Sequence, residues 1–281
     1  MIGDPRWMPW LTYAVLTLGV LLIGFPLWVA LAASTQSIEQ VRDVPMSLAL
    51  GSEFFTNFAS VLDSGAGNSA APVGRMVFNS FVVAMVIAVG KIVISLLSAY
   101  AFVFFRFPGR TLAFWLIFIT LMLPVEVRIM PTYEVMASLK LINTYTGLTL
   151  PLIASATATF LFRQFFMTIP PSLVDAARID GASPMRFFFE ILLPLSRTNI
   201  AALFVITFTY GWNQYLWPLL ITTDESMYTV VVGIRRMLAG SDAATEWHLV
   251  MMTALLAMLP PLLVVLAMQR WFVKGLVDAD K

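Results

Sequence analysis

The sequence is organised around PPSLVDAARIDGASPMRFFFEILLP, residues 170–194, which interrupts a chain built mostly of long apolar segments. The proline pair that opens it ends the preceding segment, because proline keeps the residue before it out of the α conformation. Ser172, with Asp175 three residues later, predicts the capping box of a short helix. Gly181 supplies the left-handed residue that ends this helix in a bend.

A second short helix is predicted after the bend. Ser183 followed by Pro184 is an N-cap with proline at the first helical position, and the helix runs over Met185–Leu193 until Pro194 ends it. This bent pair suits docking into a groove of a partner. The alternative is an amphipathic helix lying on the lipid surface, which would suit the apolar residues Phe187, Phe188, Phe189, Ile191 and Leu192.

The spacing within the stretch carries a resemblance. Asp175-Ala176-Ala177 is followed, after three residues, by Gly181. Nine residues then separate Gly181 from Ile191, and one residue separates Ile191 from Leu193-Pro194. This pattern resembles the EAA loop of permease subunits in binding-protein-dependent ABC importers, with Asp175 in place of the usual glutamate. The resemblance implies that residues 170–194 are a cytosolic coupling loop that contacts an ATPase through Asp175, Ala176, Ala177, Asp180, Gly181, Ala182, Ser183, Ile191 and Pro194.

Three further stretches narrow the resemblance within the family. FLFRQFFM (160–167), YGWNQYLWPL (210–219) and LPVEVR (123–128) resemble the permeases of sn-glycerol-3-phosphate importers, in a match that covers nearly the whole chain and is closest from Arg75. The resemblance implies uptake of sn-glycerol 3-phosphate, with glycerophosphodiesters as further substrates. A neutral sugar of the maltose type is the alternative, because those permeases share the loop and the topology.

Composition indicates an integral membrane protein. Hydrophobic residues make up 59% and charged residues 12% of the chain, and the mean hydropathy is +0.86. A soluble domain carries about 25% charged residues. There is no cysteine for a disulfide or a thiolate metal site, and no basic stripe that would indicate nucleic acid.

Apolar segments predict six membrane spans in one all-α permease domain. The resemblance implies the type I (MetI-like) importer fold, with a core at about residues 71–270. Residues 34–74 are predicted to be an external loop. The predicted spans are Met8–Ala33, Met76–Phe105, Leu112–Pro124 continuing to about Met130, Tyr145–Phe162, Asn199–Thr222 and Leu249–Met268.

Lysines and arginines predict the orientation, because they are more frequent in cytosolic loops. With both termini cytosolic in a bacterial inner membrane, the cytosolic segments contain more of them than the external ones, and the coupling loop lies inside. The cytosolic set is Arg6, Arg106, Arg110, Arg163, Arg178, Arg186, Arg197, Arg270, Lys274 and Lys281. The external set is Arg42, Arg75, Arg128, Lys140, Arg235 and Arg236.

The sequence contains no phosphate-binding loop of its own. Gly90-Lys91 lacks both the glycine five positions earlier and the following serine or threonine that such a loop needs. We therefore expect no enzymatic activity and no bound cofactor, with ATP and Mg used by a separate ATPase. By resemblance the partners are a second, homologous permease, two ATPase copies, a periplasmic solute-binding protein and membrane lipid. An ion-coupled secondary transporter and a non-transporting sensor are alternatives from other classes.

Several polar residues are candidates for a substrate path. Lys91 lies near the middle of the second span, where a cation is costly, and either lends positive potential to an anion path or forms an ion pair with Glu126 or a neighbouring subunit. Arg128 either binds a phosphate at the outer mouth or extends to the interface.

A second group of candidates lies near the outer end of the fifth span. Trp212, Asn213 and Gln214 either form a polar patch that faces the path or make hydrogen bonds between helices. For the tryptophan, a place in the aromatic belt at the membrane interface is a further alternative. By resemblance, the external segment with Arg235, Arg236 and Gly240 contacts the binding protein.

Overall fold

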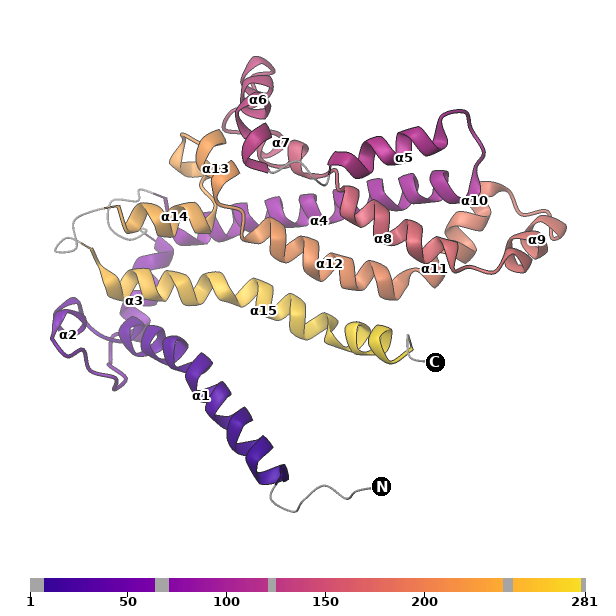
Figure 1. The fold of residues 1–281 in the computed structure, drawn as a ribbon. Coiled ribbons are helices and arrows are strands. Elements are labelled where there is room, and N and C mark those ends of the chain that lie inside the picture. Colours follow the sequence, from indigo (N-terminus) through magenta and orange to yellow (C-terminus); the bar gives the residue numbers. More distant parts are fainter. Residues whose placement is uncertain (1–7, 64–70, 121–124, 240–244, 279–281) are drawn as a thin grey trace. The chain divides into compact units, whose positions relative to one another are not determined.

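The computed structural model describes residues 8–63, 71–120, 125–239 and 245–278, and all regular elements in these ranges are helical (Figure 1). The chain divides into two compact units, Met1–Arg75 with Gly233–Met258, and Met76–Val232 with Leu259–Lys281. Within the described ranges, three helices are long and apolar enough to cross a membrane. They are α1 (Met8–Ser34), α4 (Val73–Phe104) and α15 (Trp247–Asp278), which confirms helices at the first, second and sixth predicted spans.

Two bent pairs of helices pass the same test of length and hydropathy when each pair is taken as one span. The first pair bends by 48° and the second by 72°. The first consists of α7 (Tyr145–Thr149), the 3-10 turn η2 (Leu150–Leu152) and α8 (Ala156–Met167). The second consists of α10 (Pro184–Phe187), the π-helical turn η3 (Phe188–Leu192), α11 (Leu193–Leu195) and α12 (Arg197–Trp212).

The break before α8 has a local cause in the sequence. The Ser155 hydroxyl accepts the N–H of Ala158 at 3.2 Å and so begins a new helix. On α4, Gly90 leaves room for the chain at this break, because a Cβ at that position would lie 2.8 Å from Ile153 Cγ2. The predicted fourth span is therefore helical but not straight.

The predicted fifth span, Asn199–Thr222, is not one continuous helix. Helix α12 ends at Trp212, and α13 (Leu216–Ile221) begins after a short break. A single helix would place the Pro218 ring against the carbonyl four residues earlier. The break instead puts Pro218 in the first turn of α13, where its missing N–H costs no hydrogen bond.

The predicted third span is represented by two helices, α5 (Arg110–Ile119) and α6 (Val125–Ser138). Helix α5 has ten residues, about half the length that crosses a bilayer. Residues 121–124, in the middle of the predicted span, lie outside the described residues.

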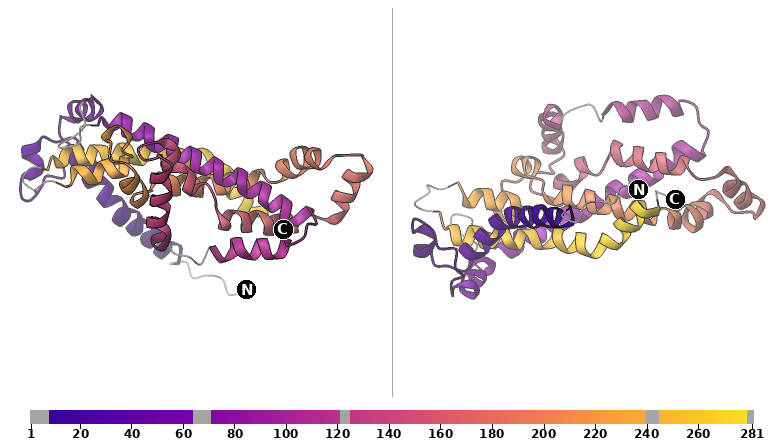
Figure 2. Two further views of the ribbon diagram at one scale, coloured as in Figure 1. Left: turned by 90° about the horizontal axis from the view of Figure 1, so that it is seen from above. Right: turned by 60° about the horizontal axis from the view of Figure 1, so that its bottom comes forward.

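Two apolar cores lie among the described residues of the second unit. One joins α4, α8 and α12 with the helices around η3 through residues that include Leu96, Phe162, Phe188 and Leu203. The other includes Val83, Leu148 and Trp217. Helices α4 and α12 approach closely, because a Cβ on Gly211 would lie 3.0 Å from Ala84 Cα. Figure 2 shows α9 (Pro171–Ile179) projecting from the end of this unit.

The first unit shows that the predicted external loop 34–74 contains regular structure. It has α2 (Ile38–Arg42) and α3 (Phe54–Asp63). Ser37 and Gln40 form a capping box at α2. In α3, buried Asn57 donates to Ser34 O and Gln36 O, both at 2.9 Å.

Beyond α13 the chain forms the 3-10 turn η4 (Glu225–Met227) and α14 (Val230–Met237).

Candidate functional site

The predicted docking element begins with α9, which differs from the expected helix in its cap. Pro170 is the N-cap and Pro171 the first helical residue, and no side chain caps this end. The predicted capping box of Ser172 and Asp175 is therefore wrong, because two prolines already set the backbone angle that begins the helix. The Asp175 carboxylate instead accepts from Arg178 Nη1 at 3.4 Å on the surface.

The bend at Gly181 is confirmed. Its φ is +74°, a conformation that glycine adopts without a Cβ penalty. The N–H of Ala182 donates to Ala177 O at 2.9 Å, and the N–H of Gly181 donates to Arg178 O at 3.0 Å. These bonds satisfy the last carbonyls of α9 and fix the bend. Asp180, the C-cap residue, is exposed at this corner.

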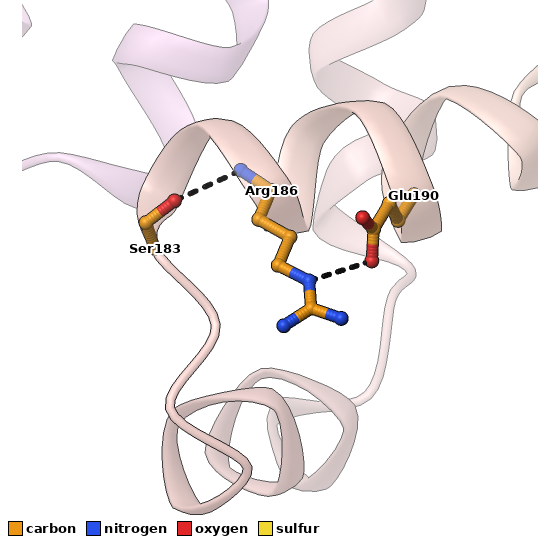
Figure 3. A network of polar contacts seen from close by, with 3 residues as sticks. All are labelled: Ser183, Arg186 and Glu190. Atoms are coloured by element: carbon orange, nitrogen blue, oxygen red, sulfur yellow. Dashed lines mark hydrogen bonds and ion pairs between the residues drawn. The ribbon is translucent and has the colours of Figure 1, made fainter.

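The second helix begins as predicted. The Ser183 hydroxyl accepts the N–H of Arg186 at 3.2 Å, with Pro184 at the first helical position. Arg186 Nε then donates to the Glu190 carboxylate at 2.8 Å one turn later (Figure 3). Both side chains of this pair are exposed, so the pair adds little stability.

The second helix does not end at Pro194 as predicted, but continues to Leu195. The π-helical turn before it explains the difference, because Leu193 N–H donates to Phe188 O five residues back. This wider turn accommodates the proline ring within the helix. Ser196 follows the last residue of this helix, and its buried hydroxyl donates to Leu192 O at 2.6 Å.

One side of the docking element is anchored in the apolar core. Ala177, Phe187, Phe188 and Leu192 are buried there, with Ala182 and Ile191 packed against them. The Tyr100 hydroxyl of α4 donates to Pro184 O at 2.7 Å. Three of the apolar residues that would suit a lipid surface are thus buried in the protein, which leaves little support for the lipid alternative.

The other side of the element is open. Asp175, Ala176, Arg178 and Gly181 are exposed, and Ile179 has 86% of its surface accessible. We call the exposed residues Asp175, Ala176, Arg178, Ile179 and Gly181 the docking face.

The second candidate feature is a cavity of about 710 Å³ in the second unit, between α4, α5, α6, α8 and α12. Lys91 and Arg128 both line it, so the structure brings two predicted path residues together. Lys91 is only 8% exposed, and its Nζ lies 3.7 Å from the ring centroid of Tyr210. Among the described residues, no carboxylate forms an ion pair with Lys91.

Of the other predicted path residues, Trp212, Asn213 and Gln214 do not line this cavity. Trp212 is buried at 2% exposure and stacks on Phe208 with 5.9 Å between ring centroids. Asn213 is the exposed C-cap of α12, and Gln214 Nε2 donates to Tyr210 O at 3.2 Å. Glu126 belongs to α6, but its side chain lies outside the described part of the chain.

The predicted binding-protein loop is partly helical. Arg235 and Arg236 are exposed in the last turn of α14, a helix the sequence reading did not predict. Gly240 lies outside the described residues.

Comparison with known proteins identifies the family. Residues 91–278 match the profile of the binding-protein-dependent transport system inner membrane component. The chain belongs to this family. It is a helical membrane permease of the ABC importer class, as predicted from the docking element.

Individual relatives match the chain along its full length and support its assignment to this family. It is 60% identical to the sn-glycerol-3-phosphate transport system permease protein UgpE of Pectobacterium atrosepticum, over all of both chains. It is 58% identical to the protein of the same name from Escherichia coli O6:K15:H31, again over all of both chains.

A solved bacterial ABC transporter for alginate import has the same fold. The match has 19% identity and a TM-score of 0.79, and it covers 97% of this chain and 100% of the other. The predicted all-α type I permease fold is thereby confirmed.

Three features of the permease were missed in the sequence. Tyr210 faces Lys91, but the sequence analysis used it only within the stretch YGWNQYLWPL that carries the family resemblance. Ser155 was not read as a helix start, although its position after the Leu-Pro of η2 is a recognisable signal. Gly90 was tested only as part of a phosphate loop, whereas it makes room for Ile153.

Proposed function

We propose that the chain forms half of the translocation path of an ATP-driven importer for sn-glycerol 3-phosphate. The observation that carries this proposal is the 60% identity to UgpE over the full length of both proteins. A cavity containing Lys91 and Arg128 supports an anionic substrate rather than a neutral one. Glycerophosphodiesters carry the same phosphate group and are expected as further substrates.

The complete importer contains other subunits. A second, homologous permease supplies the other half of the path, two ATPase copies use ATP and Mg, and a periplasmic binding protein delivers the substrate. Both termini of this chain are cytosolic, which places the docking face on the side where ATP is available. The exposed Arg235 and Arg236 of α14, with Gly240, contact the binding protein outside.

The docking face transmits the movement of the ATPase to the spans. Its exposed residues contact the ATPase, while Phe187, Phe188 and Leu192 hold the second helix in the core shared by α4, α8 and α12. Because this core is closely packed, displacement of α9 moves the attached helices as a body. ATP-driven closure then opens the path outward, and hydrolysis resets it.

Reconstitution tests the proposed substrate and energy source. The permease with its partner permease, ATPase and binding protein is placed in proteoliposomes, and uptake of radiolabelled sn-glycerol 3-phosphate is measured with and without ATP. We expect uptake only with ATP and the binding protein. Transport of maltose-type sugars instead, or uptake that an uncoupler abolishes and ATP does not drive, would refute the proposal.

Cross-linking tests the docking face separately. The chain has no cysteine, so Ile179→Cys introduces a single thiol at a position that is 86% exposed. We expect a bifunctional thiol reagent to link it to a cysteine placed in the groove of the ATPase. Phe55→Cys in α3, at 81% exposure, is the matched control and should give no such product. Equal products from both positions would contradict the docking assignment.

A further inference from the structure

The cavity between α4, α5, α6, α8 and α12 combines several features that favour a small anion. Its volume of about 710 Å³ lies within the range of roughly 300–1,000 Å³ that small-molecule sites occupy. Lys91 and Arg128 supply positive charge, and no carboxylate is among the described residues that line it. Hydroxyl groups complete the polar part of the wall, from Ser98, Thr120, Ser155, Thr157, Thr159 and Thr207.

The start of α8 adds a further positive contribution. Residues 154–159 line the cavity, and this 12-residue helix begins at Ala156 with Ser155 as its cap. The first N–H groups of a helix have no intrahelical acceptor and point toward an anion at this end. Thr159 and Ser155 are held in place, because Thr159 Oγ1 donates to Ser155 O at 2.9 Å.

Lys91 is the independent observation that points to a ligand. Its side chain is more than nine-tenths buried and faces the cavity. Among the described residues, its polar neighbour is the face of the Tyr210 ring, 3.7 Å away. A ring face stabilises an ammonium group without neutralising it. The ammonium group therefore faces the cavity without an opposite charge beside it among the described residues.

The depth of Lys91 distinguishes a transported substrate from a lipid headgroup. Helix α4 runs from Val73 to Phe104, so Lys91 lies about 4 Å from its midpoint at 1.5 Å per residue. Headgroups lie at the two faces of a hydrocarbon core that is about 30 Å thick. A phosphate group that reaches Lys91 is thus one that is crossing the membrane.

We propose that this cavity is a phosphate-binding subsite of the translocation path, in which Lys91 and Arg128 bind the phosphate oxygens of the substrate and the N-terminus of α8 stabilises the remaining charge. The inference rests on the proposed function, and it assigns substrate recognition to this subunit itself. The Tyr210 ring holds the Lys91 ammonium group in position between transport cycles.

Transport by variants of the assembled importer tests the subsite. Lys91→Met keeps the length and the packing of the side chain but removes its charge. We expect it to lower ATP-dependent uptake of sn-glycerol 3-phosphate about tenfold or more, as loss of a charged hydrogen bond predicts. Arg128→Gln, at an exposed position, should lower uptake without affecting folding. Lys91→Arg should recover part of the loss.

Control measurements separate the subsite from other roles of the lysine. Lys140→Met removes the same charge at an exposed position that does not line the cavity, and uptake should remain within twofold of the unmodified protein. Co-purification of all subunits should be unchanged in Lys91→Met. A loss of co-purification, with normal uptake by Arg128→Gln, would identify a structural ion pair with the partner permease and overturn the proposal.

Two further outcomes are decisive. If the unmodified importer transports sn-glycerol 3-phosphate and Lys91→Met does so within twofold, the subsite is refuted and the proposed function stands. If the unmodified importer does not transport it, both are refuted. A defect of Lys91→Met that appears only in vesicles with anionic phospholipid, and not in phosphatidylcholine, would assign the cavity to a lipid headgroup and also overturn the proposal.

Discussion

Substitution of Gly181 gives the sharpest test of the bend in the docking element. Its φ is +74°, and no atom lies within 4 Å of the position a Cβ would take. The cost of a side chain here is therefore conformational and not steric. An ordinary L-residue in the left-handed region costs roughly 1–2 kcal/mol, which changes the ratio of bent to unbent forms by a factor of about 5–30. A β-branched residue costs more.

The magnitude predicts a graded series. Gly181→Asn should retain most activity because asparagine tolerates this conformation. Gly181→Ala should lower ATP-dependent uptake by a factor of up to about 5–30. Gly181→Val should lower it the most. Uptake and ATP hydrolysis are measured together in proteoliposomes, and we expect uptake per ATP hydrolysed to fall because the docking face no longer fits the ATPase.

The chain offers a matched control for this series. Gly109 at the start of α5 has φ +77° and also has no atom within 4 Å of a Cβ, so Gly109→Val imposes the same backbone cost outside the docking element. It should leave the ratio of uptake to hydrolysis unchanged. If Gly181→Val transports as well as Gly109→Val, the bend is not needed for coupling and the reasoning fails.

Three other substitutions have specific expected outcomes. Tyr100→Phe removes the hydroxyl that donates to Pro184 O at 2.7 Å and should weaken the anchoring of α10 by about 1 kcal/mol, seen as lower uptake per ATP with normal assembly; unchanged stoichiometry would count against this anchor. Gly211→Val places a branched side chain where a Cβ would lie 3.0 Å from Ala84 Cα and should lower the Tm of the solubilised complex through overpacking of about 1–3 kcal/mol. Gly24→Val, with nothing within 4 Å, is its control, and equal Tm changes would contradict the close approach of α4 and α12. Ser183→Ala removes the acceptor of Arg186 N–H and should cost about 1 kcal/mol, measured as faster amide hydrogen exchange over residues 184–187; unaltered exchange would show that the cap is not needed.

The docking element was largely predictable from sequence because its determinants are local. The Gly181 bend and the Ser183–Pro184 cap each depend on residues within a few positions of one another, and both are present. The capping box at Ser172 was wrong because the preceding prolines are an equally local but competing signal. The continuation past Pro194 required knowledge of the π-helical turn, which a hydrophobic pattern does not reveal.

The cavity was only partly predictable because it is assembled from five helices. Lys91 and Arg128 were recognised individually by the cost of burying charge in a membrane, but nothing in the sequence placed them on one cavity. Tyr210 is 119 positions from Lys91 in the sequence, and only the packing of α4 against α12 brings them together. The bends within the predicted spans likewise depend on tertiary contacts, such as that of Gly90 with Ile153.

Helix α4 carries both Lys91 and Tyr100, nine residues or about 14 Å apart along the axis. If Lys91 binds the substrate while Tyr100 holds the docking element, the single helix α4 connects the substrate site to the surface that contacts the ATPase. Thermodynamic linkage then requires reciprocity: the factor by which ATP binding changes the affinity of the cavity for a phosphate ester equals the factor by which that ester changes the affinity for ATP. The ATPase would then respond to substrate in the cavity through α4 of this chain, without a contribution from the second permease.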